Sequence, residues 1–443
     1  MGWLLNGVYF GLVLCIAPVI LWKRFRTGKY RDGWGQKLIG RLPQRESDGP
    51  CLWFHAVSVG EVLQLRTVLR ELLSLRPDLE IVISTTTSTG HAVAQEQFPN
   101  HTVCYFPLDF TWSVKRAIRR IRPSAIVLVE LELWPNFIRI ASQMDVPLAL
   151  INGRISERSF RGYRRIRPLM RNLLRRFDLL AVQDSAYADR LIELGAPAEV
   201  VHVTGSVKFD GVNTNRDNPA TRSIRESLGL QTDEVVLIAG STQSPEEEVA
   251  IRIWLALRAE FPKFRLVLVP RHQERFEDVA DVVQRFGLPL VRRSVVRESG
   301  ESTPVQNGND SPVVLIDTLG ELGACWGFAD FAFVGGSLSV GRGGQNMIEP
   351  AAYGAAVVVG PDTKNFRSVV ELLQAGDAIH IAADAEALQK VIRNWLTNPV
   401  DTQAWGRRAQ QLVLTQQGAT TRTCRMLLPL LGKEESDRST VAA

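Results

Sequence analysis

Short apolar runs alternate with longer stretches of helical period along most of the chain. The short runs predict strands, and apolar residues spaced three and four positions apart predict helices. In the first half, strands are predicted over 51–54, 80–86, 102–106, 125–130, 147–151, 179–183 and 200–204. In the second half, they are predicted over 235–239, 265–269, 289–291, 313–316, 331–334, 356–359 and 378–381. This alternation is typical of α/β domains with parallel sheets.

A polar stretch over 211–233, expected to be a linker with a short helix, separates the two series of strands. It leaves two doubly wound, Rossmann-like domains, over 23–210 and 234–400. A C-terminal helical segment is expected over 401–431, and a disordered tail over 432–443. Two such domains facing an interdomain cleft would bind ligands at the carboxyl ends of their strands.

The first apolar stretch is different in kind. Residues 3–22 carry almost no charge, have a tryptophan at each end and are followed directly by basic residues. Their length suits a bilayer core of about 30 Å. A cleaved signal peptide would carry its positive charges before the apolar core, so the order predicts an uncleaved anchor over 1–22. The alternative is an apolar helix that packs against the protein itself or lies in the interface, which Asn6 and Pro18 favour.

Charge and cysteine content narrow the class of protein. The 443 residues carry a formal net charge of +5, which favours anionic partners. The 5 cysteines are scattered without a C-x-x-C pair, which argues against a disulfide framework or a structural zinc site.

Two stretches concentrate the positive charge. Residues 115–122 hold five basic residues and no acid, and residues 154–177 hold nine arginines and one glutamate. Such one-sided stretches beside a predicted anchor favour an anionic lipid surface as partner. Nucleic acid is the rival, but no recognisable nucleic-acid module accompanies the arginines.

The first strand runs into HAVSVGEV, residues 55–62, which reads as a tight turn and a helix start. Such a turn usually binds phosphate, yet Glu61 follows Gly60 and would repel it. Glu61 is either a residue stabilised by the helix dipole or a general base. A third interpretation makes Ser58 a nucleophile, although the first glycine of G-x-S-x-G is missing.

Further polar candidates follow later strands of the first half. VELELWPN, residues 129–136, places Glu130 and Glu132 at a strand end. Acids two positions apart share a face of an extended chain, so both, or only one if the chain turns, would point into the cleft. Either could instead pair with nearby arginines. Lys208, in TGSVKFD, follows the last strand of the first domain and by itself is consistent with a solvated lysine.

The second half holds residues suited to a nucleotide sugar. Arg271 ends a strand in VPRH and can donate to phosphate, while DTLGEL offers Gly320 and Glu321. The glycines of FVGGSLSVGRGGQNMIEPAAYG, residues 333–354, allow close backbone approach, and the loop feeds a helix start that suits a phosphate. Glu349 could accept from sugar hydroxyls. The loop matches neither the dinucleotide nor the P-loop pattern.

Seven motifs occur in an order that resembles one known family: HAVSVGE, VELELWPN, NGRIS, TGSVKFD, VPRHQERF, DTLGEL and GGSLSVGRGGQNMIE. They are similar to the 3-deoxy-D-manno-octulosonic acid (Kdo) transferases of Gram-negative lipopolysaccharide assembly, and the resemblance covers nearly the whole chain. It implies a GT-B fold and an inverting transfer of Kdo from CMP-Kdo to a lipid A precursor, a tetra-acyl disaccharide bisphosphate. It also implies no metal or cofactor, and an inner-membrane protein whose body faces the cytoplasm.

The resemblance assigns roles by motif. It makes Glu61 the general base and Glu130 and Lys208 the stabilisers of the transition state. Its CMP contacts fall on Pro270, Arg271, Leu319, Gly320, Glu321, Asn346, Met347, Ile348 and Glu349.

Two motifs depart from the family pattern. The family usually reads GGHNP where this chain has Gln345 and Met347, and S-T-H-x-G-E-E where it has Gln243 and Pro245. Glutamine donates hydrogen bonds but holds no proton charge, so an ionic role of those histidines does not carry over.

Two alternatives remain open from the sequence. One is a membrane-associated GT-B transferase that uses a different nucleotide sugar and lipid acceptor. The other is a non-catalytic nucleotide-sugar binding protein in which Glu61 only stabilises a helix start.

Overall fold

The computed structural model describes residues 33–300 and 311–432, together with positions 6, 7, 9–11, 15, 18, 22 and 26. The chain forms two compact units, one of residues 1–210 with 417–443 and one of residues 211–416. The first unit is therefore built from two separate parts of the sequence.

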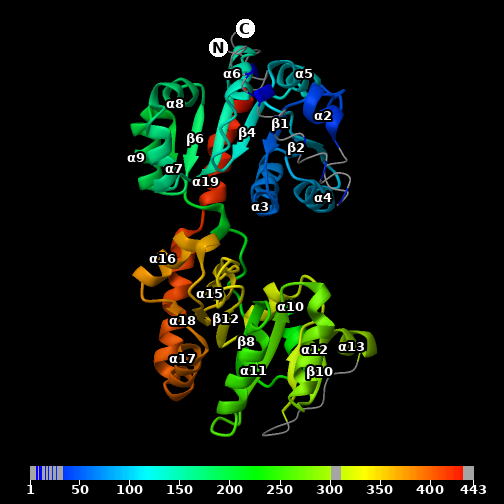
Figure 1. Ribbon diagram of the computed structural model, residues 1–443, viewed down its shortest axis with the longest axis vertical. Helices are drawn as coiled ribbons and strands as arrows, with labels where there is room; N and C mark the ends of the chain where they lie inside the picture. The colour runs from blue at the N-terminus through cyan, green and yellow to red at the C-terminus, as the bar shows by residue number, and fades with distance from the viewer. Residues whose placement is uncertain are drawn as a thin grey trace, which may run out of the picture. The chain divides into compact units, whose positions relative to one another are not determined.

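The first unit contains a seven-stranded parallel sheet (Figure 1). Its strands are β1 (Cys51–His55), β2 (Glu80–Thr85), β3 (Thr102–Tyr105), β4 (Ala125–Val129), β5 (Leu148–Gly153), β6 (Leu179–Val182) and β7 (Val201–Val203). They lie in the order β3-β2-β1-β4-β5-β6-β7, so the direction of chain progress reverses between β1 and β4. Ligands of open α/β sheets bind at the carboxyl ends of strands at such a switch point.

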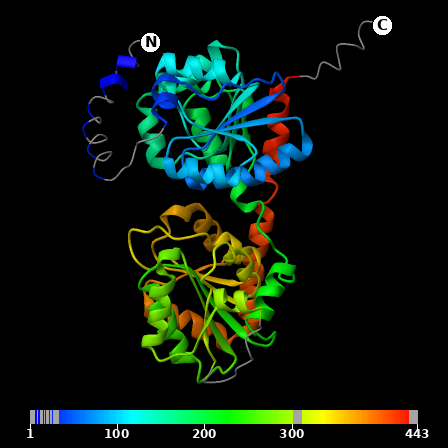
Figure 2. The ribbon, with the colours of Figure 1, turned by 90° about the vertical axis from the view of Figure 1, so that its right-hand side faces the viewer.

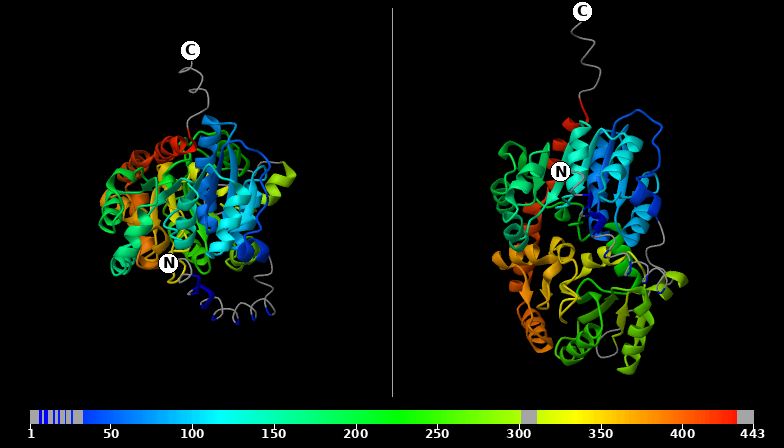
Figure 3. Two further views of the ribbon diagram at one scale, coloured as in Figure 1. Left: turned by 90° about the horizontal axis from the view of Figure 1, so that it is seen from above. Right: turned by 45° about the horizontal axis from the view of Figure 1, so that its top comes forward.

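Helices cover both faces of this sheet (Figure 3). They are α2 (Trp34–Ile39), α3 (Val59–Leu75), α4 (Ser88–Gln97), α5 (Thr111–Ile121), α6 (Pro135–Gln143), α7 (Glu157–Arg164), α8 (Arg167–Leu174), α9 (Ser185–Glu193) and α19 (Ala419–Leu427). Successive residues of β1 enter opposite cores: Trp53 packs with residues of α5, α6 and α8, whereas Leu52 and Phe54 pack with residues of α3 and α19. Burial on both faces explains why the strands read as continuous apolar runs.

Helix α19 joins the first unit from the far end of the sequence, as its red ribbon shows in Figures 1 and 2. Asp210, the last residue before the second unit, accepts hydrogen bonds from the backbone N–H groups of Gly418 and Thr420 at 2.7 and 2.5 Å. Cys424 and Leu427 are buried against α3. Asp210, where the chain leaves the first unit, thus binds the start of α19, where the chain returns to that unit.

The second unit repeats the architecture. Its strands are β8 (Val235–Thr242), β9 (Phe264–Pro270), β10 (Leu290–Arg292), β11 (Val313–Leu315), β12 (Phe331–Val334), β13 (Ala356–Val359) and β14 (His380–Ile381). They form a parallel sheet in the order β10-β11-β9-β8-β12-β13-β14, which places the switch point between β8 and β12. Each of the strands in the two units overlaps one predicted from the sequence.

The helices of the second unit are α10 (Pro219–Ser227), α11 (Glu246–Leu257), α12 (Phe276–Arg285), α13 (Arg293–Ser299), α14 (Leu322–Cys325), α15 (Ile348–Ala352), α16 (Arg367–Ala375), α17 (Ala385–Thr397) and α18 (Pro399–Gln416). The helical segment expected over 401–431 is interrupted, because Gly418 adopts a left-handed φ of 92° between α18 and α19. The two helices belong to different units.

The expected anchor over 1–22 and the tail over 432–443 fall largely outside the described residues. Within the part that the structure describes, no helix is both long enough and apolar enough to cross a membrane. Asn6 is 7% exposed, and its side chain bonds Thr111 at the start of α5, donating at 2.8 Å and accepting from the backbone N–H at 3.1 Å. At this position the N-terminal segment packs against the first unit.

Candidate active site

Glu61 lies in the first turn of α3, just after the carboxyl end of β1, and is 8% exposed. The backbone N–H of Val57 and the hydroxyl of Ser58 each donate to one of its carboxylate oxygens at 2.7 Å. Burial raises the pKa of Glu61, the two hydrogen bonds oppose this shift, and the charge of Glu130 adds to it. A carboxylate with a raised pKa holds a proton more readily than an exposed glutamate, as a general base must.

The Ser58 side chain is hydrogen-bonded to the start of α3. It is the N-cap of α3, and its side chain accepts from the backbone N–H of Glu61 at 3.4 Å while donating to that residue's carboxylate. These contacts are those of a capping residue, and they hold the Glu61 carboxylate in one orientation.

Glu130 follows β4, across the switch point from Glu61. It takes a left-handed φ of 58°, which is strained for a residue with a side chain and is concentrated at functional sites. Its carboxylate accepts from Nε of Arg154 at 2.8 Å and from the amide of Gln64 at 3.4 Å. The ammonium nitrogen of Lys208 lies 4.0 Å from Oε1 of Glu130, the oxygen that also accepts from Gln64. Glu130 is thus an anion flanked by two cations.

Hydrogen bonds between two side-chain amides connect the segments around Glu130 and Lys208. Asn152 also has a left-handed φ, 53°, and donates to the side-chain oxygen of Gln64 at 2.6 Å. Its own oxygen accepts from the backbone N–H of Val207 at 3.3 Å, one residue before Lys208. Gln64 and Asn152 therefore link the segments that carry Glu130 and Lys208. Asn152 begins the NGRIS motif, but no role was assigned from the sequence to it or to Gln64.

Glu132 is the second acid of VELELWPN. Its carboxylate accepts from the indole N–H of Trp134 at 3.1 Å, and burial, with the charge of Glu61 second, raises its pKa to about 7. Both acids of this segment therefore lie close enough to Glu61 to feel its charge or to act on it. Glu130, however, is the one that contacts Lys208 and Arg154.

Lys208 lies in the turn after β7. Burial lowers its pKa, while the negative charges of Glu130 and Glu61 oppose that shift and Arg154 reinforces it. The structure thus brings Glu61, Glu130 and Lys208 together at the carboxyl edge of the first sheet. From the sequence, each of them was identified separately, after a different strand.

In the second unit, Arg271, Asn346 and Glu349 form one cluster. The side-chain amide of Asn346 donates to Glu349 at 3.0 Å, and its oxygen accepts from the backbone N–H of Ile348 at 3.0 Å. Burial raises the pKa of Glu349, and the Asn346 bond and the charge of Arg271 oppose it. This pairing of a carboxylate with a nearby guanidinium suits a ligand that carries both hydroxyls and a phosphate.

The DTLGEL segment adds a second carboxylate. Arg293 donates through Nε and Nη2 to the two oxygens of Glu321, both at 3.0 Å, and the Thr318 hydroxyl also donates to it. Burial alone would raise the pKa of Glu321, but these donors bring it below its usual range. Leu319 is 67% exposed, and Gly320 has a left-handed φ of 82°.

Three other predicted CMP contacts have buried side chains. Pro270 is buried at the end of β9, and Met347 and Ile348 are 0% and 1% exposed. Any contact of Met347 or Ile348 with a nucleotide would therefore be made by the backbone.

The glycine-rich loop after β12 is held by the protein's own acids. Glu246, 2% exposed, accepts from the backbone N–H groups of Gly336, Ser337 and Leu338 at 2.7, 3.0 and 3.0 Å. Asp362 accepts from those of residues 341–343 at 2.6, 2.9 and 2.9 Å. The N–H groups at these positions are therefore already bonded to carboxylates that are distant in sequence.

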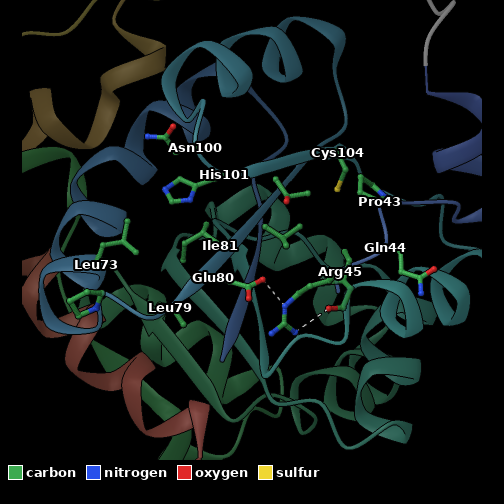
Figure 4. Close-up of a pocket in the computed structure, with 14 residues that line it drawn as sticks. Pro43, Gln44, Arg45, Leu73, Leu79, Glu80, Ile81, Asn100, His101 and Cys104 are labelled. Carbon is green, nitrogen blue, oxygen red and sulfur yellow. Dashed lines mark hydrogen bonds and ion pairs between the residues drawn. The ribbon is translucent and has the colours of Figure 1, made fainter. Parts of the chain in front are cut away.

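Two hollows lie at the opposite, amino edge of the first sheet. One, of about 330 Å³, is lined in part by Glu80 of β2, Thr102 of β3 and Arg45, whose Nε donates to Glu80 at 2.8 Å (Figure 4). The other, of about 640 Å³, is lined by Arg167, Arg171 and Arg175 of α8 together with Gly195, Ala196, Pro197 and Glu199. Neither contains the predicted catalytic residues.

The arginines of α7 and α8 are mostly exposed, and some of them pair locally. Arg161 donates to Glu157 at 3.0 Å, and Arg164 lies 3.8 Å from Glu193. These contacts involve side chains more than half exposed, where such pairs contribute little to stability.

Comparison with known proteins identifies relatives of this chain. A family profile described as "3-Deoxy-D-manno-octulosonic-acid transferase (kdotransferase)" matches residues 32–211. The 3-deoxy-D-manno-octulosonic acid transferase of Haemophilus influenzae is 33% identical over 431 residues, covering 96% of this chain and 98% of that one. That of Bordetella pertussis is 32% identical over 443 residues, covering 96% and 100%.

Among solved structures, a UDP-GlcNAc 2-epimerase from Neisseria meningitidis aligns with a TM-score of 0.58. The alignment covers 86% of this chain and 100% of that chain at 12% identity, which shows a shared GT-B-like fold and nothing of activity. The two curated relatives, in contrast, align over almost their entire length at about one identical residue in three. On this similarity the chain belongs to the family of 3-deoxy-D-manno-octulosonic acid transferases, which are glycosyltransferases.

Proposed function

We propose that this protein transfers Kdo from CMP-Kdo to a lipid A precursor, a tetra-acyl disaccharide bisphosphate, in lipopolysaccharide core biosynthesis. Glu61 is the general base of an inverting reaction that draws on no metal. The observation that carries the proposal is the cluster of Glu61, Glu130 and Lys208 at the switch point of the first unit. Family membership supports the sugar that is transferred.

In the proposed step, an acceptor hydroxyl oxygen forms a bond to the anomeric carbon of Kdo. The bond from that carbon to the phosphate oxygen of CMP breaks, and CMP leaves with the electron pair. Glu61 takes the hydroxyl proton as the new bond forms. Attack on the face opposite to CMP inverts the configuration of the anomeric carbon.

Glu130 and Lys208 are proposed to stabilise the charges that develop in this step. The sugar gains positive character as CMP departs, and a fixed carboxylate such as Glu130 stabilises it electrostatically. In the free protein, Arg154 at 2.8 Å and Lys208 at 4.0 Å offset the negative charge of the Glu130 carboxylate. Both cations are also suited to the anionic groups of the substrates.

In the second unit we propose that CMP contacts Arg271 and the Asn346–Glu349 pair. Arg271 would donate to the phosphate, and Glu349 would accept from ribose hydroxyls. The remaining contacts that we expect are made by Pro270, Leu319, Gly320 and Glu321, and by the backbone of Met347 and Ile348.

We further propose that the protein works at the cytoplasmic face of the inner membrane, where its acceptor would be embedded. The apolar residues 3–22 and the exposed arginines of α7 and α8 support this placement. Basic residues near an anionic leaflet contribute about 1 kcal/mol each.

Glu61→Gln tests the proposed function. The variant keeps the size of the side chain but removes the basic carboxylate, so turnover of CMP-Kdo and precursor should fall by about 10²–10⁴-fold. Product is measured by mass spectrometry, and CMP affinity by calorimetry should not change. Glu96→Gln, a substitution of an exposed glutamate in α4, is the matched control.

Near-normal turnover by Glu61→Gln would remove Glu61 from the role of base. Titration of the native protein with CMP and UDP separates the proposal from its closest alternative. Tighter binding of UDP would favour a transferase that uses a different nucleotide sugar.

A further inference from the structure

Two glutamine side chains, Gln243 and Gln345, converge at the switch point of the second unit. Gln243 directly follows β8, and Gln345 lies in the loop after β12. A Cβ atom added to Gly336 would lie 3.2 Å from Nε2 of each glutamine. We call these two residues the amide pair. Both are half-buried, so they line the surface without being closed off from a ligand.

Arg342 determines which end of Gln243 faces Gly336. Its Nη1 donates to Oε1 of Gln243 at 2.5 Å. A guanidinium can only donate, so the oxygen of this amide faces Arg342 and its NH₂ group faces Gly336. The site therefore presents amide N–H donors beside an exposed cation.

Six backbone N–H groups around this site already have hydrogen-bond acceptors within the protein. The N–H groups of residues 336–338 are bonded to Glu246, and those of residues 341–343 to Asp362. At these six positions, hydrogen bonds to a ligand are therefore left to side chains, among them those of the amide pair and Arg342.

The amide pair also lies between predicted nucleotide contacts. Thr242, just before Gln243, accepts from the backbone N–H of Arg271 at 3.0 Å. On the other side, Gln345 is followed by Asn346, which donates to Glu349. A nucleotide held by Arg271 and Glu349 would have its next polar groups within reach of the amide pair.

We propose that Gln243, Gln345 and Arg342 bind an anionic oxygen of the nucleotide-sugar donor. The shared chemistry is that of a phosphate or a sugar carboxylate, since both accept several hydrogen bonds from amides and guanidinium. The proposal rests on the proposed function, because it takes CMP-Kdo as the donor. Gln243, Gln345 and Arg342 are not among the CMP contacts that the family motifs imply.

The test uses two substitutions at each position of the amide pair in the full-length protein. Gln243→Leu and Gln345→Leu remove the amide at similar size. Gln243→Glu and Gln345→Glu keep the shape but replace the N–H donors by a second acceptor oxygen, and Gln243→Glu can still accept from Arg342. Gln374→Leu, at an exposed position of α16, is the matched control. Thermal melting checks that each variant is folded.

Each variant is titrated with cytidine and with CMP, and assayed for the KM of CMP-Kdo. If the phosphate is bound here, the substitutions weaken CMP by about 10- to 100-fold and leave cytidine unchanged. If the sugar carboxylate is bound, CMP affinity is unchanged and the KM for CMP-Kdo rises by about the same factor. In both cases the glutamate variants are at least as impaired as the leucine variants, because a second carboxylate repels the anion.

Two results would overturn the inference. One is an amide-pair variant set that matches Gln374→Leu in both CMP affinity and KM. The other is glutamate variants that behave like the native protein while leucine variants are impaired, which would indicate a role in packing alone. Failure of the native protein to bind CMP or use CMP-Kdo would instead contradict the proposed function, so the two failures are distinguishable.

Discussion

Replacing Glu246 by glutamine should loosen the glycine-rich loop after β12. The loop depends on a carboxylate whose two oxygens each accept two backbone N–H groups. Oε2 accepts from Gly336 and Gln243 at 2.7 and 2.8 Å, and Oε1 from Ser337 and Leu338 at 3.0 Å each. An amide has only one oxygen, so whichever way it turns, its NH₂ group faces two N–H donors.

The magnitude follows from which of these bonds are buried. Each oxygen serves one buried bond, to Gly336 or Ser337, and one partly buried bond. Leaving one buried donor without a partner costs about 1–3 kcal/mol, and converting two charge-assisted bonds to neutral ones costs about 1 kcal/mol more for each. The loop should therefore be destabilised by roughly 3–5 kcal/mol, equivalent to at least about a 100-fold change in its opening equilibrium.

Hydrogen exchange read by mass spectrometry measures this locally, in peptides spanning residues 335–345. Glu371→Gln in α16 is the control, because its carboxylate lies 4.0 Å from Arg367 and both side chains are largely exposed. Amides of the loop should exchange at least about 100-fold faster in Glu246→Gln than in the control.

Loop exchange within about threefold of the control would refute the reasoning. It would mean that the N–H groups find other acceptors at little cost. The affinity for CMP, measured on the same samples, then reports whether the shape of the loop matters for the nucleotide.

Three further predictions concern the nucleotide, the base and the basic helices. Arg271→Ala should weaken CMP binding by about 1.5–3 kcal/mol in calorimetry, and an unchanged affinity would remove Arg271 from the site. The kcat/KM profile should fall as pH decreases through a pKa above that of an ordinary glutamate, since burial raises the pKa of Glu61 and protonation removes the base. Activity that stays constant down to about pH 4.3 would contradict this. Reversing Arg164, Arg165 and Arg171 to glutamate should weaken binding to anionic vesicles by roughly 1 kcal/mol per residue and leave CMP affinity unchanged. Equal sedimentation of native and reversed protein with such vesicles would show that these arginines are only solvated.

The central strands were predictable from the sequence because they are buried on both faces. Runs such as residues 125–129 and 356–359 consist almost entirely of β-branched and aliphatic residues, and no helix pattern competes with them. Helix α19 was harder to assign, since its sequence does not indicate which unit its apolar residues pack against. Its partner Asp210 lies about half the sequence away, and local patterns carry no information about such pairs.

The candidate site was predictable mainly where a residue follows the end of a strand. Glu61, Glu130 and Arg271 were located in this way, and the resemblance supplied their roles. The supporting roles of Gln64 and of Asn152, the first residue of NGRIS, were missed, because an amide that supports a carboxylate looks like any polar residue of a helix or strand. The use of the loop by Glu246 was missed for a related reason: its acceptor role depends on a helix start that folding brings beneath the glycines.

The return of the chain to the first unit has a consequence for the order in which the protein is made. One apolar face of the first sheet is covered partly by Cys424 and Leu427, which leave the ribosome after every residue of the second unit. All strands and helices of the second unit, in contrast, lie within residues 211–416 and are available earlier. During synthesis, the first unit therefore cannot complete the core around α3 until α19 has been made, whereas the second unit can complete its core before then.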